Sequence, residues 1–308
     1  MRRITTAPVE NVLKPHDGTK SPEPAVFSFS DYDVGAGEKL YVSTFEEALR
    51  DRQSRHHPHR HDFYQIFWMR LGAPSFNIDF YHFMIEARAL VFVPPGAVHN
   101  FEEMNTPDGF ILSFQDDFFE SEGYSVDLFA ECPPLDPAQI RTVLTVPESS
   151  LETVQGYCAR MFEELNAKRE GYRTATASLL RLLFVEIRRC LSNQSAPSSF
   201  RKYSSLTARF LRMLNARPYR LTTASEVARL LGVSRSWLNQ QVREETSKNL
   251  TDHLQGRLIL ESKRLLAHSD LNVSEIAYQL GCEDPSYFTR LFRQVQGVSP
   301  REFREEYR

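Results

Sequence analysis

Two sets of hydrogen-bonding and basic side chains recur in the second half of the chain, at an offset of 50 residues. The first set is Ser236, Asn239, Gln240 and Arg243, and the second is Ser286, Thr289, Arg290 and Arg293. Their spacing of three and four residues is that of one face of a helix. In the DNA major groove, arginine pairs best with guanine, and asparagine or glutamine with adenine. The two sets therefore predict two DNA-reading surfaces, although a solvated helix face is the alternative for any single residue.

Each set lies on the second helix of a repeated helix-turn-helix pattern. We expect the first helix of each unit to begin at a capping box and to end at a glycine with positive φ. These residues are Thr223, Glu226 and Gly232 in the first unit, and Asn272, Glu275 and Gly281 in the second. Ser234 is the expected N-cap of the second helix in unit one, and Asp284 with Pro285 begins its counterpart in unit two.

The apolar residues of these helices indicate which face is buried. Leu238 and Val242 in unit one, and Phe288 and Phe292 in unit two, lie opposite the polar sets and are expected in the core. A helix of about 250–268 between the units is predicted to be a rigid spacer. Successive major-groove segments on one face of DNA lie about 34 Å apart, so a single chain could read both.

Residues of about 207–306 resemble the DNA-binding domain of the AraC/XylS family of bacterial transcription regulators. The residues that carry the resemblance are 257–266, 273–281, 284–290, 292–293, 297–300 and 303–304. It implies helix-turn-helix units at 225–246 and 273–296, with base contacts near Ser236, Asn239, Gln240, Ser286, Thr289 and Arg290. Gln240 stands where the family commonly has Arg, which favours adenine over guanine at that contact.

The stretch from about 26 to 115 reads as short strands separated by turn residues, a pattern typical of an antiparallel barrel or sandwich. It resembles the small cupin barrel that many such regulators carry. Residues 59–61, Gln65 and Gly72 approximate the first cupin motif, and 94–99 the second. In metal cupins two His, a Glu and a distal His bind a divalent ion. Because Gln65 occupies the Glu position, a metal-free effector pocket is favoured over a metal site or purely structural histidines.

Four residues are expected to bind the effector: His59, His61, Tyr64 and His99. Strand alternation puts His59, His61 and Phe63 on one face, so Tyr64 joins them only if a bulge follows His61. The cupin resemblance brings His99 across the barrel to meet the other two imidazoles. Buried imidazoles need partners, which a polar effector, an ion or a mutual hydrogen-bond network would supply.

Helical periodicity replaces the strand pattern after Pro147. One helix is expected to begin at Ser149 or Ser150, and a second covers about 174–191. The second has more apolar surface than one small sheet needs, which leaves burial on its own barrel and a dimer interface as equal alternatives. Residues 1–24 are predicted to be disordered, and residues 192–206 to be a linker.

Length, composition and charge agree with two soluble domains. The 308 residues are 41% hydrophobic and 25% charged. No stretch approaches the roughly 20 apolar residues of a membrane helix, and no secretory signal follows Met1, so we expect a cytoplasmic chain without a membrane partner. The net charge of −3 divides into +6 for residues 197–308 and −9 for the rest. A basic domain is weak evidence for a nucleic-acid partner.

No constellation of catalytic residues stands out. The chain has no Gly-rich phosphate loop and no G-x-S-x-G motif. The four cysteines form no C-x-x-C pair and are expected to be buried reduced thiols; they are Cys132, Cys158, Cys190 and Cys282. We therefore expect neither an enzyme nor a cofactor.

The sequence as a whole predicts an α+β multidomain regulator. It would comprise a cupin-like jelly-roll barrel that senses an effector (25–146), a helical segment that could dimerise (147–191) and an all-α reader (207–306). We expect a homodimer that responds to a small effector, reads two successive major-groove segments of promoter DNA and acts with RNA polymerase. The family more often activates than represses. The alternative is a cupin metalloenzyme with an accessory DNA-binding tail, which metal bound through the histidines would support.

Overall fold

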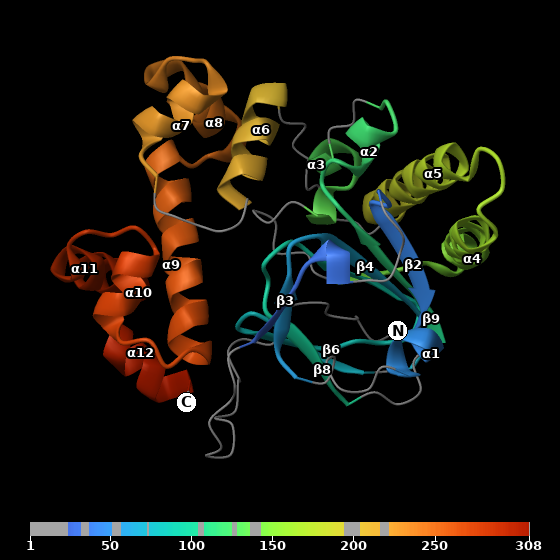
Figure 1. Cartoon of the computed structure of the whole chain (residues 1–308), viewed down its shortest axis with the longest axis horizontal. Helices are drawn as coiled ribbons and strands as arrows, with labels where there is room; N and C mark the ends of the chain where they lie inside the picture. The colour runs from blue at the N-terminus through green and yellow to red at the C-terminus, as the bar shows by residue number, and fades with distance from the viewer. Residues whose placement is uncertain are drawn as a thin grey trace. The chain divides into compact units, whose positions relative to one another are not determined.

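The computed structural model describes residues 24–31, 37–50, 57–72, 74–103, 108–124, 128–135, 143–193, 204–215 and 222–307. They belong to two compact units, one within residues 25–200 and the other within 201–308 (Figure 1). The N-terminal segment predicted to be disordered lies outside the described residues, apart from Pro24, as does most of the predicted linker. None of the described helices is long and apolar enough to cross a membrane.

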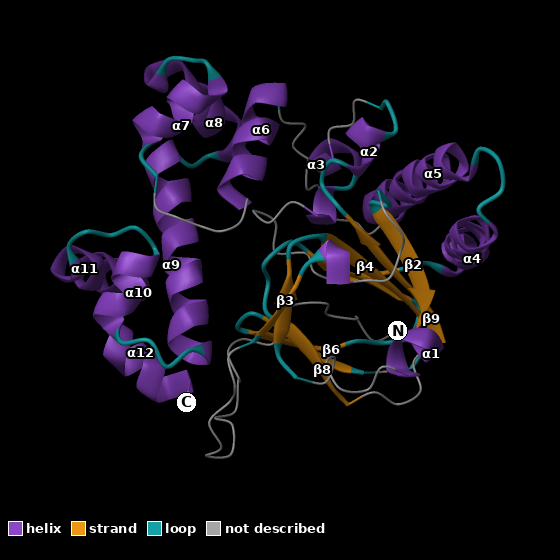
Figure 2. Cartoon of the chain, in the orientation of Figure 1, coloured by secondary structure: helices purple, strands orange, loops and turns teal. Residues whose placement is uncertain are grey.

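Two five-stranded sheets form the core of the N-terminal unit (Figure 2). One sheet has the order β1 (Ala25–Phe27), β3 (His59–His61), β8 (His99–Glu103), β5 (Ser75–Ile78), β6 (Tyr81–Met84). The other has the order β10 (Val143–Thr145), β7 (Ala89–Val93), β4 (Tyr64–Leu71), β9 (Asp108–Phe114), β2 (Leu40–Thr44). The predicted β-rich fold is confirmed. Paired strands run antiparallel except β1 and β3, which are parallel, so the antiparallel prediction is wrong at that edge.

Strand alternation gives β4 two different faces. Phe67 and Met69 belong to an apolar cluster that draws residues from both sheets and therefore lies between them. Trp68 points the other way and donates its indole N–H to Gln155 of α4 at 2.7 Å. Odd-numbered residues of β4 thus face the interior, and even-numbered residues face the covering helices.

Helices α4 (Leu151–Ala167) and α5 (Tyr172–Asn193) cover the outer face of the β2–β9–β4 side. The Phe110 and Phe162 rings lie 5.9 Å apart, and the Phe114 and Phe184 rings 6.1 Å apart. Ser150 is the N-cap residue of α4, but its side chain makes no capping hydrogen bond. The shorter elements are η1 (Phe29–Asp31), α1 (Phe45–Arg50), α2 (Phe118–Ser121), α3 (Leu128–Glu131), η2 (Pro133–Leu135) and η3 (Glu148–Ser150).

Most of the apolar surface of α5 is buried within its own unit. The fully buried residues are Ala177, Leu180, Leu183, Phe184, Ile187 and Cys190. Leu182 is 46% exposed, with Leu179 and Val185 half-buried beside it. Burial on the barrel therefore accounts for most of the extra apolar surface that the sequence predicts for this helix. A narrow strip of three apolar residues stays at least partly exposed. The helix also extends to Asn193, so the predicted linker begins too early by two residues.

Within its described residues, the C-terminal unit consists of helices joined by short turns. Its helices are α6 (Ser205–Asn215), α7 (Ala224–Leu231), α8 (Arg235–Thr246), α9 (Leu250–His268), α10 (Val273–Gln279), α11 (Pro285–Gln296) and α12 (Pro300–Tyr307). The pairs α7–α8 and α10–α11 are the two predicted helix-turn-helix units. Helix α9 packs against α6, α7 and α8 as well as α10 and α12, and so joins the two (Figure 1).

The predicted caps of the two second helices are confirmed. The Ser234 hydroxyl accepts the Trp237 N–H at 3.2 Å, and the Asp284 carboxylate accepts the Ser286 N–H at 2.8 Å. Pro285 is the first residue of α11. These local hydrogen bonds satisfy backbone donors that a helix start leaves free, and so fix where each helix begins.

The two capping boxes differ. In α10, Asn272 and Glu275 each accept the backbone N–H of the other, at 2.9 and 2.7 Å. In α7, Thr223 accepts the Glu226 N–H, but the Glu226 carboxylate accepts the Thr222 hydroxyl at 2.7 Å. The predicted box is thus reciprocal in unit two and one-sided in unit one.

Helix α9 contains a buried network of charges. Glu261 is 3.0 Å from the guanidinium of Arg257 and 2.5 Å from that of Arg264, and all three residues are buried. A buried carboxylate needs such partners, because desolvation penalises an isolated charge. These two arginines are therefore buried and paired with Glu261 of the same helix, and they do not belong to the exposed basic surface.

Candidate functional site

The first predicted set of DNA-reading residues lies on the outer face of α8. Leu238 and Val242 are fully buried beneath it. Ser236, Gln240 and Arg243 are exposed, and Asn239 is half-buried. The buried and exposed faces of α8 are therefore those that the helical periodicity predicts.

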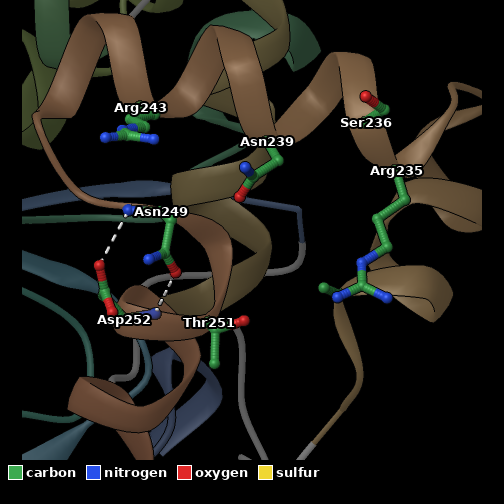
Figure 3. Close-up of a pocket in the computed structure, with 8 residues that line it drawn as sticks. Arg235, Ser236, Asn239, Arg243, Asn249, Thr251 and Asp252 are labelled. Carbon is green, nitrogen blue, oxygen red and sulfur yellow. Dashed lines mark hydrogen bonds between the residues drawn. The ribbon is translucent and has the colours of Figure 1, made fainter.

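A groove of about 610 Å³ runs beside this face (Figure 3). It is lined by Ala224, Arg235, Ser236, Asn239, Arg243, Asn249, Thr251 and Asp252. Figure 3 shows Arg235 and Arg243 at opposite ends of the group, with Asn239 between them. The first turns of α7, α8 and α9 all contribute residues, and helix N-termini carry partial positive charge. The Arg235 guanidinium and these helix starts suit a phosphate group, while the Asp252 carboxylate in the same groove is occupied in capping α9.

Two members of the first set have hydrogen-bond partners on the protein. The Asn239 side-chain oxygen accepts the Leu250 N–H at 3.1 Å, which ties α8 to the start of α9. The Gln240 amide donates to the Glu244 carboxylate at 2.9 Å. Asn239 therefore has a structural bond through its oxygen, while its NH₂ group remains the side able to donate to a base.

The second set lies in the same way on α11. Phe288 and Phe292 are fully buried. Ser286, Arg290 and Arg293 are exposed, and Thr289 is half-buried with its hydroxyl donating to the Pro285 carbonyl at 2.9 Å. The Arg290 side chain is 74% exposed, and its guanidinium is 3.9 Å from Asp284.

The three barrel histidines lie together on one sheet. His59 and His99 are direct partners across β3 and β8, with ring centroids 4.3 Å apart, and the His61 and His99 rings are 4.8 Å apart. His99 also packs against Phe67 and Phe76 of the interior. The expected grouping is therefore present, but His99 comes from the neighbouring strand and not from across the barrel. The position of His99 depends on the order of strands in the sheet, and this order is set by contacts between residues far apart in the sequence.

Each histidine has one ring nitrogen bound to the backbone. The Nδ1 atoms of His59, His61 and His99 lie 3.0, 2.7 and 3.1 Å from the carbonyl oxygens of His57, Phe63 and Ala97. Since a carbonyl only accepts, each Nδ1 carries a proton, and Nε2 is then an acceptor wherever the ring is neutral. The Nε2 atoms of His61 and His99 are buried and have no hydrogen-bond partner among the residues that the structure describes.

The imidazoles of His61 and His99 are neutral at physiological pH. Burial, and then the nearby His59, lower the pKa of His61 to about 3. Burial also lowers the pKa of His99 well below its usual value, with smaller contributions from His59 and His61. The site therefore presents uncharged acceptors that need a donor.

Tyr64 lies away from the histidines. Its ring stacks on Phe114, with centroids 5.5 Å apart, and Phe114 in turn contacts Phe184 of α5. Strand β3 ends at His61, and Phe63 stacks on the His61 ring at 4.2 Å. Alternation along β4 then turns Tyr64 to the helix-covered face, so it does not join the three histidines.

The donor set does not fit a metal ion. Among the described residues, no group of three or more His, Cys, Asp or Glu is arranged to hold one. Gln65, at the position where metal cupins supply a carboxylate, is neutral and donates its amide N–H to Ser113 at 3.1 Å. The described part of the barrel therefore gives no support to the metalloenzyme alternative.

Comparison with protein families decides the identity of both units. Residues 45–184 match the model of the AraC-like ligand-binding domain, and residues 227–306 match a helix-turn-helix domain. The two matched segments together make up more than half of the chain. The chain belongs to the AraC family of transcription regulators. It is thus a DNA-binding regulator with a ligand-binding barrel and a helix-turn-helix reader, as its sequence predicts.

Known members of the AraC family and solved structures resemble the chain over different lengths. The transcriptional activator RhaS of Klebsiella pneumoniae (strain 342) is 24% identical over 270 residues, 87% of this chain and 94% of that protein. The activator RhaR of Cronobacter sakazakii is 37% identical over 70 residues, 23% and 25% of the two chains. The DNA-binding domain of AdpA in complex with a target DNA is 26% identical, covers 34% of this chain and 95% of that one, and has a TM-score of 0.32. Fatty-acid-bound ToxT from Vibrio cholerae is 14% identical over 87% of this chain and 94% of its own, with a TM-score of 0.35.

Several surface residues of this AraC-family reader were missed at the sequence level. Arg235 and Thr251 line the groove beside α8. Trp237 and Tyr287 occupy matching positions in α8 and α11 and are 49% and 45% exposed. The offset of 50 residues relates the two aromatic residues in the sequence and could have revealed them. The groove residues come from separate helices, so no single periodic pattern identifies them.

Proposed function

We propose that this AraC-family chain is an effector-responsive activator that reads two successive major-groove segments of promoter DNA. The observation that carries the proposal is the matched construction of α8 and α11, each with a buried apolar face and an exposed polar and basic face. Helix α9 packs against both units and is stiffened by its buried charge network. Two recognition helices held in this way suit sites about 34 Å apart on one face of DNA.

The contacts to DNA divide into two kinds. Base edges in the two segments are contacted by Ser236, Asn239, Gln240 and Arg243 from α8, and by Ser286, Thr289, Arg290 and Arg293 from α11. Arg235 and Thr251, in the groove beside α8, contact the phosphate backbone, which fixes the register without carrying sequence information.

The barrel responds to a small effector held by His59, His61 and His99. The Nε2 atoms of His61 and His99 are neutral acceptors, so the effector supplies hydrogen-bond donors, and no metal ion is required. Effector binding shifts the population towards a form that can engage RNA polymerase at the promoter. Activation is proposed because the relatives RhaS and RhaR are named transcriptional activators.

The working form is a homodimer in the cytoplasm, where promoter DNA lies. The apolar strip of Leu179, Leu182 and Val185 on α5 supports a contact between two copies. Sedimentation of the full chain at micromolar concentration is expected to give a dimer. A monomer both with and without DNA would remove this part of the proposal.

The proposed function is tested by selecting bound duplexes from a random pool and placing the selected site upstream of a reporter gene. We expect two enriched segments about one helical turn apart, and reporter expression that rises with the chain present in its native host. Enrichment of no sequence would contradict the DNA-reading role. Reporter expression that falls would make the chain a repressor.

A further inference from the structure

The reading face of α8 carries a side-chain pair with no counterpart in α11. The Gln240 amide nitrogen donates to the Glu244 carboxylate at 2.9 Å, one helical turn further along. Both side chains are exposed on the surface that includes the predicted base contacts. The residues at the same positions in unit two are Arg290 and Gln294, neither of which is acidic.

The bond to Glu244 fixes which atoms Gln240 presents to DNA. One of its two amide hydrogens is used by the carboxylate, which leaves the other hydrogen and the carbonyl oxygen free. Adenine offers an acceptor, N7, and a donor, its N6 amino group, on its major-groove edge. One free N–H and one free carbonyl oxygen match that pair of groups, whereas guanine offers only acceptors on this edge.

A carboxylate on this face lowers the affinity for DNA, so its presence needs an explanation. DNA binding depends strongly on positive charge, and Glu244 adds a negative charge to the face of α8 that is proposed to meet DNA. Its effect on affinity is unfavourable for every DNA sequence alike. Its effect on Gln240 is selective, because an amide held in one orientation reads one base edge better than an amide that rotates freely.

We propose that Glu244 is a specificity-determining residue, which orients Gln240 so that unit one selects adenine at one position of its DNA segment. The proposal rests on the DNA-reading function proposed above. Glu244 acts as a positioning residue, because it works through Gln240 and not through the base itself.

The test compares the full-length wild type with Glu244→Ala and Glu244→Gln. Each protein is used to select bound duplexes from a random pool, and its affinity for random-sequence duplex is measured by fluorescence anisotropy. In Glu244→Ala, the adenine preference at one position should fall by roughly tenfold. Affinity for random duplex should rise in the same variant, because a negative charge has been removed.

The Glu244→Gln variant separates orientation from charge. Its side-chain carbonyl still accepts the Gln240 N–H, so the adenine preference should return while affinity for random duplex stays raised. Gln294→Ala is the matched control on α11, and it should leave the preference in the unit-one segment unchanged.

Two results would overturn the inference. If Glu244→Ala raises affinity for all sequences and keeps the adenine preference, Glu244 only repels DNA. Alternatively, the preferences in both segments could weaken together, which would indicate a general change in the fold. A wild-type chain that enriches no sequence contradicts the proposed function itself.

Discussion

The two helix-turn-helix units share their buried construction and differ on their exposed faces. Leu238 and Phe288 hold the same position and are both fully buried. At the exposed positions two residues further on, Gln240 in unit one corresponds to Arg290 in unit two. The buried positions set the fold, and the exposed positions are free to differ in what they read.

The correspondence continues beyond the two units. Asn249 and Asp252 cap α9 reciprocally, and Ser299 and Glu302 cap α12 in the same way 50 residues later. His253 in α9 then corresponds to Phe303 in α12, and both are buried. The repeat therefore includes the helix that follows each unit, and it contains an ionisable core residue only after unit one.

Truncating the matched core residues Leu238 and Phe288 should change the stability of the reader more than any other substitution considered. Phe288→Ala should lower the free energy of unfolding of the reader by about 3–5 kcal/mol, and Leu238→Ala by about 2–5 kcal/mol, since each leaves a cavity in a fully buried site. In a Trp68→Phe background, urea unfolding can be followed by the fluorescence of Trp237, the remaining tryptophan of the sequence. A large loss in one variant and none in the other would break the equivalence of the two units.

Arg290 should allow unit two to discriminate between base pairs at one position of its DNA segment. Arg290→Ala should lose roughly 1–3 kcal/mol of discrimination at one base pair, because the exposed guanidinium can bind a guanine edge through two hydrogen bonds. Binding is measured by titrating specific and random duplexes. An equal loss of affinity for both would make Arg290 a phosphate contact.

Acid should destabilise the part of the reader that contains His253. Burial, and then Lys248, lower its pKa to about 4, while Asp252 opposes the shift. Between this value and the unfolded value near 6.5, the unfolded chain binds more protons, so stability falls as the pH drops through that window. His253→Phe, which copies unit two, should reduce the loss between pH 7 and pH 5 by on the order of 1 kcal/mol.

This pH effect is measured as the change in unfolding free energy between the two pH values, in wild type and variant. All other ionisable groups are the same in both proteins, so their contribution cancels in the difference. The same pH dependence in both proteins would show that His253 does not carry it.

The barrel variant should have the smallest effect on DNA binding by either unit. His61→Ala combined with His99→Ala should abolish the response to effector and leave DNA affinity nearly unchanged, because the reader is a separate compact unit. Reporter expression from the cognate promoter measures the response, and anisotropy measures the affinity. Normal induction in the double variant would place the effector site elsewhere.

Local features of the fold could be predicted from the sequence. The caps at Ser234 and Asp284 depend on residues two or three positions away. The positive φ values at Gly232 and Gly281, +74° and +84°, depend on the turn in which each glycine lies. The buried faces of α8 and α11 follow from helical period alone. All of these are settled within a few residues of the chain.

Long-range features could not be predicted in this way. The neighbouring positions of β3 and β8, which place His99 beside His59, depend on how the chain between the two strands folds. The turn between β3 and β4 decides that Tyr64 leaves the histidine face. The groove beside α8 joins residues from three helices, and the Gln240–Glu244 bond is one of several that the same spacing allows.

The central claim is that both units of one chain read DNA, and footprinting on a selected duplex tests it most directly. Hydroxyl-radical and methylation protection by the full-length protein should reveal two major-groove segments on one face of the duplex, about 10 base pairs apart. Arg290→Ala should weaken protection of one segment, and Gln240→Ala that of the other. Protection of a single segment, lost equally in both variants, would contradict the account.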